Sequence, residues 1–357
     1  MQLSFIGTDI QLAKLSKLGD ILEKINSVID WEVFRKPLED VLRKADYSKG
    51  GRPPWCVILM LKIVMLMDWY KLSYHQAEYQ CNNRLDFMRF LGIECGAKIP
   101  DENTIWDFKE AIKIHGIERT LFEIFNEKLE EYGYQLNSGS MIDASFVEVP
   151  KRRVISETQL KEPDKLLENE SINVTLEKAD DTILVIANDD KTQNILSQTD
   201  FEARWTKKNN QTYFGYKDHT AVDKDTKFIT NYAVTSAEVH DSQVFLRFIS
   251  RQTNAVWADS AYLSEEIIVA LRKINPEIMI NICHRAYRNK PLTDEQKAEN
   301  SLIAKVRARV EHVFGRMEQL GGMVLNCIGL ERAQRDIGLK NLGYNIQRFS
   351  TLKYQKA

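Results

Sequence analysis

The sequence contains few cysteines, and none of them lies in a metal-binding pattern. An odd number of cysteines without a CxxC pair does not indicate a disulfide framework, so we expect free thiols in a reducing cytoplasm. A zinc site at Cys283 and His284 would lack a second ligand pair at the usual spacing, so buried thiols are the favoured interpretation. The five cysteines are Cys56, Cys81, Cys95, Cys283 and Cys327.

The sequence also lacks a long apolar run. Its most apolar stretch, residues 55–67, is too short to cross a bilayer and contains Lys62, so it predicts a buried helix. The first ten residues have neither the basic stretch nor the apolar run of a secretory signal. We therefore expect a cytoplasmic protein that is neither exported nor held in a membrane.

The sequence has no large net charge: 49 basic and 51 acidic residues give −2. The net charge alone therefore does not indicate a nucleic-acid partner. The distribution is uneven, however. Residues 155–202 contain 12 acids and 4 bases, whereas residues 301–357 contain 10 bases and 4 acids. The neutral total therefore hides a basic surface.

Helical periodicity dominates the first 135 residues. Apolar positions recur at helical spacing in residues 11–29, 55–69, 73–90 and 117–132, and Ser73 and Gln76 have capping-box spacing. Residues 104–112 form a further helix that follows Pro100 and two acids. We predict an all-helical N-terminal domain over residues 1–135. A helix-turn-helix that binds DNA ends fits this pattern, and a dimerisation domain fits it equally well.

After Gly139 the periodicity changes to that of strands. Residues 140–149, 213–222 and 228–235 predict strands, the last two as a hairpin; helices at 241–249 and 264–274 then alternate with strands at 255–259 and 277–283. A long amphipathic helix ends near Glu318. This order predicts an α/β mixed sheet with flanking helices over residues 136–357. Residues from about 155 to 200 form an acidic, loop-like insertion with core periodicity only at 182–187.

Three carboxylates occupy unusual places in this pattern. Asp143 lies within a strand, Asp259 ends a strand at the edge where α/β sheets gather ligands, and Glu311 lies beside the apolar stripe of the long helix. If the strands of Asp143 and Asp259 are parallel neighbours, the three acids converge. Such a cluster suits Mg²⁺ or Mn²⁺, and a pair of these ions supports displacement reactions at phosphorus.

Each acid also has a structural alternative. Asp143 can form an ion pair with Lys217, and Asp259 can cap a helix, although Ser264 already supplies a good cap for the next one. Glu311 can pair with Arg307 one turn earlier. The position of each acid alone does not decide between these readings.

At these acids the chain resembles the insertion-sequence DDE transposases, in particular the group of insertion sequence five. The three catalytic blocks of that group resemble MIDAS at residues 141–145, VWADSAY at 256–262 and RARVEHVF at 307–314. Further similarity lies at residues 51–92, 99–104, 203–208, 213–219 and 235–242. The family often has Tyr and Lys in the third block, where this chain has Ala304 and Glu318; Arg316 is a candidate replacement for the Lys.

The resemblance implies a ribonuclease-H-like catalytic domain in which Asp143, Asp259 and Glu311 are the catalytic residues and the metal ligands. It further implies Mg²⁺, with Mn²⁺ as an alternative, and DNA cleavage followed by strand transfer. The expected partners are the terminal inverted repeats of a transposon and target DNA, bound by a homodimer at the bacterial nucleoid.

Lysines and arginines near these blocks are candidates for contacts to DNA phosphates. Trp205 lies among bases and can stack on an unpaired base, although a place in the core suits it nearly as well. His219 and His240 are expected to be structural histidines outside the metal site. The candidate DNA-binding residues are Lys151, Arg152, Arg153, Arg204, Trp205, Lys207, Lys208, Lys217, Arg307 and Arg309.

Three other functions fit parts of the sequence. A nuclease or repair enzyme on the same fold would cut DNA without strand transfer. A transposase-derived DNA-binding protein would lack chemistry, but all three acids are present here. A small-molecule phosphohydrolase is disfavoured by the helical N-terminal region and the basic C-terminal segment.

Overall fold

The structure is a computed structural model that describes residues 5–42, 54–136, 139–151, 155–179, 182–208, 210–287 and 291–356. The described residues before β1 contain helices and no strand, as the sequence predicts. These helices are α1 (Phe5–Leu18), α2 (Ile21–Val28), η1 (Trp31–Phe34), α3 (Arg35–Leu42), α4 (Val57–Tyr70), α5 (Tyr74–Asn83), α6 (Leu85–Leu91), α7 (Glu102–His115) and α8 (Ile117–Glu131).

Local sequence signals explain where these helices begin and end. Asp20 caps α2 directly after Gly19, whose positive φ of 87° ends α1, so the single predicted helix over residues 11–29 is two. Ser73 and Gln76 form the predicted capping box at α5. The apolar helix α4 is buried as expected, and its Lys62 donates hydrogen bonds to Asn26 and to the carbonyl of Phe90.

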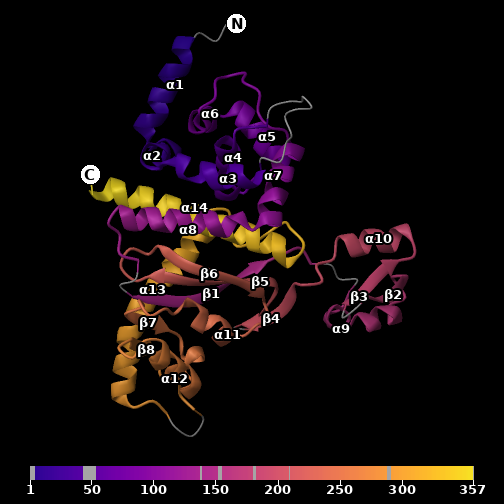
Figure 1. Cartoon of the computed structure of the whole chain (residues 1–357), viewed down its shortest axis with the longest axis vertical. Coiled ribbons are helices and arrows are strands. Elements are labelled where there is room, and N and C mark those ends of the chain that lie inside the picture. Colours follow the sequence, from indigo (N-terminus) through magenta and orange to yellow (C-terminus); the bar gives the residue numbers. More distant parts are fainter. Residues whose placement is uncertain are drawn as a thin grey trace.

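A six-stranded mixed sheet forms the middle layer (Figure 1). The strand order is β4–β5–β1–β7–β8, with β6 also paired to β5; β1, β7 and β8 are parallel, while β4, β5 and β6 are antiparallel to their neighbours. The hairpin and the parallel strands predicted from the sequence are confirmed. The strands are β1 (Ser140–Glu148), β4 (Arg204–Lys208), β5 (Gln211–Asp223), β6 (Ile229–Ser236), β7 (Ala255–Ala258) and β8 (Met279–Ile282).

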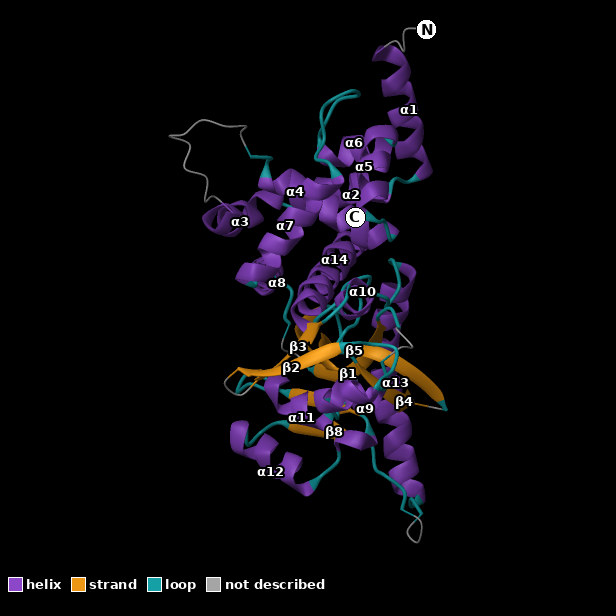
Figure 2. Cartoon of the chain, turned by 90° about the vertical axis from the view of Figure 1, so that its right-hand side faces the viewer, coloured by secondary structure: helices purple, strands orange, loops and turns teal. Residues whose placement is uncertain are grey.

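Helices cover both faces of this sheet (Figure 2). The N-terminal helices, α8 and the C-terminal helix lie on one side, and α11 and α12 lie on the other (Figures 1 and 2). No helix among the described residues is both long and apolar enough to span a lipid bilayer. The helices after β6 are α11 (Ser242–Phe245), η4 (Leu246–Phe248), η5 (Ser260–Tyr262), α12 (Glu265–Ile274), α13 (Asp294–Gln319) and α14 (Leu330–Lys356).

The insertion at about 155–200 is folded, whereas the sequence predicts a loop-like segment. It contains a two-stranded sheet beside short helices, and its buried residues Leu160, Leu166 and Ile195 are continuous with the main hydrophobic core. Figure 1 shows it at the side of the molecule, beyond β4. Its elements are α9 (Glu157–Lys161), η3 (Pro163–Glu168), β2 (Val174–Ala179), β3 (Thr182–Ala187) and α10 (Asp190–Ser197).

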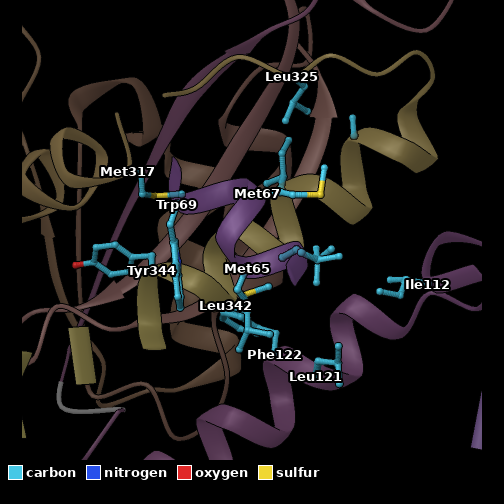
Figure 3. Packing of buried hydrophobic residues seen from close by; sticks show 14 of the residues in the cluster. Met65, Met67, Trp69, Ile112, Leu121, Phe122, Met317, Leu325, Leu342 and Tyr344 are labelled. Carbon is cyan, nitrogen blue, oxygen red and sulfur yellow. The ribbon is translucent and has the colours of Figure 1, made fainter. Parts of the chain in front are cut away.

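The C-terminal helix α14, which the sequence analysis does not predict, joins the two halves of the chain. It packs on α2, α4, α7 and α8 and also on β6. Figure 3 shows Leu342 and Tyr344 of α14 among Met65 and Trp69 of α4 and Phe122 of α8. One hydrophobic core therefore runs from the N-terminal helices to the sheet, and a second core lies beneath the sheet around Phe245 and Tyr262.

Candidate active site

The parallel strands β1 and β7 bring Asp143 and Asp259 to the same level of the sheet. Met141 of β1 lies opposite Trp257 of β7. The same register carried two residues further sets Asp143 beside Asp259, at the point where β7 has ended. Since neighbouring strands lie about 4.8 Å apart, the two carboxylates share one edge of the sheet, as the sequence predicts.

Arg307 of α13 lies between the two aspartates. Its Nη2 is 3.5 Å from Oδ2 of Asp143, and its Nη1 is 3.8 Å from Oδ1 of Asp259. Burial alone would lower the pKa of Arg307, but the two carboxylates, together with Cys283, outweigh this effect and raise it. The described residues offer its buried Nε no hydrogen-bond partner. Arg307, a candidate phosphate contact, is thus held by the acids.

The carboxylate of Asp143 is only partly compensated by its surroundings. Burial raises its pKa above the ordinary value, against the lowering effects of the Ala144 N–H at 2.9 Å and of Arg307. The neighbouring charge of Asp259 adds to the increase. A half-buried carboxylate whose charge is disfavoured, next to a second carboxylate, fits the binding of a cation with oxygen preference.

Asp259 is half-exposed and begins the short helix η5. Its Oδ1 accepts a hydrogen bond from the backbone N–H of Ser260 at 2.5 Å, and its side chain is 49 % exposed. The cap of α12 is supplied by Ser264, which accepts from the N–H of Ile267 at 3.2 Å. Asp259 therefore caps only a single turn, and its exposure leaves the carboxylate accessible to a ligand.

Glu311 is an exposed residue of α13, one turn after Arg307. Residues four apart lie on the same face of a helix, so Glu311 is on the face that carries Arg307 to the aspartates. Arg307 pairs with the aspartates and not with Glu311. No three His, Cys, Asp or Glu side chains within the described ranges are gathered as a metal site. The structure thus brings together two of the three predicted acids.

Tyr262, which sequence reasoning did not single out, adds a buried hydroxyl near the acids. Its side chain is 2 % exposed, and its Oη finds no hydrogen-bond partner in the described part of the chain. Burial and the charges of Asp241, Asp143 and Asp259 raise its pKa. Its place in the motif VWADSAY was the one available sequence signal.

Lys217 has a different position from the predicted surface contact to DNA. Its side chain is 8 % exposed, and its Nζ donates to the carbonyl of Val239 at 2.7 Å and to Oδ1 of Asp241 at 2.9 Å. An amine held in this way is not available to a phosphate, and it does not pair with Asp143. His219 is also buried, bonded to Thr235, with a pKa lowered by burial, in agreement with a structural role.

Two of the residues predicted to bind DNA, Arg204 and Trp205, lie in β4 and are only partly exposed. Arg204 is tied to the carbonyls of Phe201 and Ala203, so it is poorly placed for a phosphate. Trp205 is half-buried, and the centroid of its ring lies 5.1 Å from that of Phe214. This packing favours a structural role for Trp205.

Three lysines in the same region are exposed. Lys207 and Lys208 point out from the end of β4, and Lys151 pairs with Glu148 on the surface. Arg309 of α13 is also accessible, with 44 % of its side chain exposed. The predicted residues Arg152 and Arg153 lie outside the described residues.

A cavity of about 470 Å³ lies away from the acids, between α4, α7 and α14. Its walls contain interlocked ion pairs: Glu110 accepts from Arg332 and Arg335, and Lys340 pairs with Asp68 at 2.7 Å. Hydrogen bonds from Arg332, Lys113 and Arg335 lower the pKa of Glu110 to about 2, against the effect of burial. These pairs join α7 and α4 to α14.

Two family models of transposases match the sequence of this chain. Residues 135–346 match the family described as Transposase DDE domain, and residues 10–111 match the Transposase domain (DUF772). The cryo-EM structure of the piggyBac transposase synaptic complex with hairpin DNA is 10 % identical, with a TM-score of 0.44 over 91 % of this chain and 75 % of that chain. The first match covers more than half of the chain and contains both aspartates and Arg307, so the chain belongs to the DDE transposases, enzymes that use divalent metal ions to cut DNA and transfer its strands.

Proposed function

We propose that this transposase cuts and rejoins DNA at the ends of a mobile element through a centre formed by Asp143, Asp259 and Glu311. The proposal rests mainly on one observation. Asp143 and Asp259 come from the neighbouring parallel strands β1 and β7, and both pair with Arg307 of α13. Glu311 is assigned as the third acid because it follows Arg307 by one helical turn and matches the third block of the family. The strand order, with an antiparallel hairpin beside parallel strands, supports a ribonuclease-H-like fold.

The metal that we propose for this centre is Mg²⁺, with Mn²⁺ able to replace it. When bound, a divalent ion supplies charge that stabilises the oxygens of a displacement reaction at phosphorus. Asp143 and Asp259 would hold it, because their clustered carboxylates have one neighbouring cation between them and suit oxygen-preferring ions. Arg307 lies between the two carboxylates and holds them in position.

The DNA partners that we propose are the terminal inverted repeats and the target duplex, bound by a homodimer. Exposed Lys151, Lys207, Lys208 and Arg309 are retained as phosphate contacts because their side chains reach solvent. Residues 1–135 are proposed as the domain that recognises the ends, and 136–357 as the catalytic domain. The matching blocks further support membership in the group of insertion sequence five.

The decisive experiment compares Asp259→Asn and Glu311→Gln with Glu295→Gln, which changes an exposed glutamate at the start of the same helix. On DNA with terminal repeats and Mg²⁺, we expect the first two variants to lose cleavage and joined products by about 10³-fold, which corresponds to about 4 kcal/mol of barrier. DNA binding should remain, and Glu295→Gln should behave like the parent.

Gel separation of cut and joined strands measures this outcome. Full activity of Asp259→Asn would refute the assigned centre, whereas full activity of Glu311→Gln alone would remove only the third acid. Cut DNA without joined products from the unchanged enzyme would indicate a nuclease.

A further inference from the structure

The turn between β5 and β6 is held in one shape by both C-terminal helices. Arg309 of α13 donates to the carbonyl of Lys224 at 2.6 Å. From α14, Arg348 donates to the carbonyl of Thr226 at 2.8 Å, and Tyr344 donates to that of Lys227 at 3.0 Å. Two helices thus use polar side chains to fix a surface turn.

This turn gathers more positive than negative charge. Lys227 lies 3.1 Å from Nδ1 of His312, and within the described ranges neither Lys227 nor Arg348 has a carboxylate at ion-pair distance. Asp225 is shared by Lys224 and Arg309. Burial and the charges of Arg348 and Arg309 lower the pKa of Lys227. Cations that repel one another in this way are stabilised when an anion binds between them.

Lys227 also has an unusual backbone. Its φ of 62° lies in the left-handed region, which is unfavourable for a side chain with a Cβ. The carboxylate of Asp223 imposes the turn by accepting from the N–H of Thr226 at 2.7 Å. Residues kept in such conformations cluster at binding sites. The strained residue here is the one that carries the uncompensated amine.

We propose that the cluster of Lys224, Lys227, Arg309, His312 and Arg348, called the turn cluster, binds a backbone phosphate of DNA. The turn cluster lies on a different flank of α13 from Arg307, because Arg309 is about 200° and His312 about 140° around the helix axis from it. A duplex that crosses the exposed side of α13 would contact the acids on one flank and the turn cluster on the other. The inference rests on the proposed function, since that function makes DNA the polyanion present.

The test exploits a matched pair of lysines. Lys227→Gly removes the amine and relieves the left-handed strain, so folding should be unharmed. Lys71→Gly makes the same change at an exposed lysine with φ of 53° that ends α4, outside the turn cluster. We expect Lys227→Gly to weaken binding of a terminal-repeat duplex several-fold, and Lys71→Gly to leave it unchanged.

Binding is measured by fluorescence anisotropy between about 50 and about 200 mM salt, where one lost phosphate contact reduces the slope of log affinity against log salt by about 0.9. Arg348→Gln should give the same loss and serves as a second variant. If both variants bind like the parent, with an unchanged slope, the inference is overturned while the proposed function stands. If the unchanged protein binds no duplex, the inference and the proposed function are both wrong.

Discussion

Asp143 and Asp218 are carboxylates of the sheet, one half-buried and the other fully buried, yet only Asp143 could be identified from the sequence. Asp143 interrupts an apolar strand, which marks it as exceptional. Asp218 lies in a polar stretch of β5, and its complete burial comes from Asn341 and its neighbours on α14. Its partner is 123 residues away in the chain, so local pattern carries no signal of this contact.

Asp218 should make the protein less stable as the pH rises. Burial raises its pKa to about 7, although Asn341 and Lys340 oppose the shift, whereas the unfolded value is about 3.9. Between these values the folded state binds more protons, so the free energy of unfolding falls with pH and the loss is complete above about 7. Asp218→Asn cannot ionise, and its amide can donate to the unpartnered Oδ1 of Asn341.

We therefore expect Asp218→Asn to match the parent near pH 4 and to exceed it near pH 8 in urea unfolding. Asp107→Asn, at an exposed aspartate of α7, controls for charge alone. A constant difference between Asp218→Asn and the parent over this range would show that Asp218 does not titrate as described.

The ion-pair partners of Arg307 could not be predicted from its neighbours in the sequence either. The sequence offered Glu311 as its nearest acid, because residues four apart in a helix are neighbours. In the structure Arg307 instead contacts Asp143, 164 residues earlier, and Asp259. The spacing within a helix was predictable, but the strand edge that the helix faces depends on the whole sheet.

Helix α14 was not predicted because many of its buried residues are polar, so its buried face does not form an apolar pattern in the sequence. Arg335, Lys340, Asn341, Asn345 and Gln347 are nearly inaccessible, and their polarity conceals an apolar stripe. Each of these residues has a partner far from it in the chain; Asn345, for example, accepts from the N–H of Ile229 and donates to its carbonyl. Strands β1, β5, β6, β7 and β8 and most of the shorter amphipathic helices were predictable from their periodicity, whereas β4 and the two-stranded sheet of the insertion were not predicted.

Close packing of α14 on β6 requires a glycine at 338. A Cβ there would collide with the hydroxyl of Tyr232 and lie 2.8 Å from Cγ of Glu118. Tyr232 cannot yield easily, since it packs edge-on against Phe122. Gly338→Ala should therefore destabilise the protein by about 1–3 kcal/mol.

Gly315→Ala is the matched control, because a Cβ at this glycine of α13 meets nothing within 4 Å. It should stabilise the helix by about 0.5–1 kcal/mol. Chemical denaturation measures both effects. Equal stability of the two variants would contradict tight packing at Gly338.

The division into an N-terminal and a catalytic domain at residue 135 remains a prediction. The continuous hydrophobic core suggests that the N-terminal part does not fold independently. Leu339, Leu342, Ile346 and Phe349 of α14 belong to the same core as the N-terminal helices. Burial of four such side chains contributes on the order of 8 kcal/mol, similar to the entire stability of a domain. The sequence could not reveal this, because more than two hundred positions separate these residues from the N-terminal helices.

Residues 1–135 alone should consequently fail to form a stable fold. We expect the isolated segment to show helical circular dichroism without a cooperative thermal transition, whereas the whole chain unfolds with its helices and sheet together. A sharp transition of the segment, with dispersed amide signals in its nuclear magnetic resonance spectrum, would contradict this expectation and support an autonomous N-terminal domain.

The position of α14 has a consequence for synthesis on the ribosome. The first helices emerge early, but the helix that completes their packing is translated only after the whole catalytic sheet. Until then their apolar faces stay open to solvent. A premature stop codon before Leu330 would thus release a chain that still contains the acids, the strands of the sheet and the lysines proposed to contact DNA, yet is prone to aggregate.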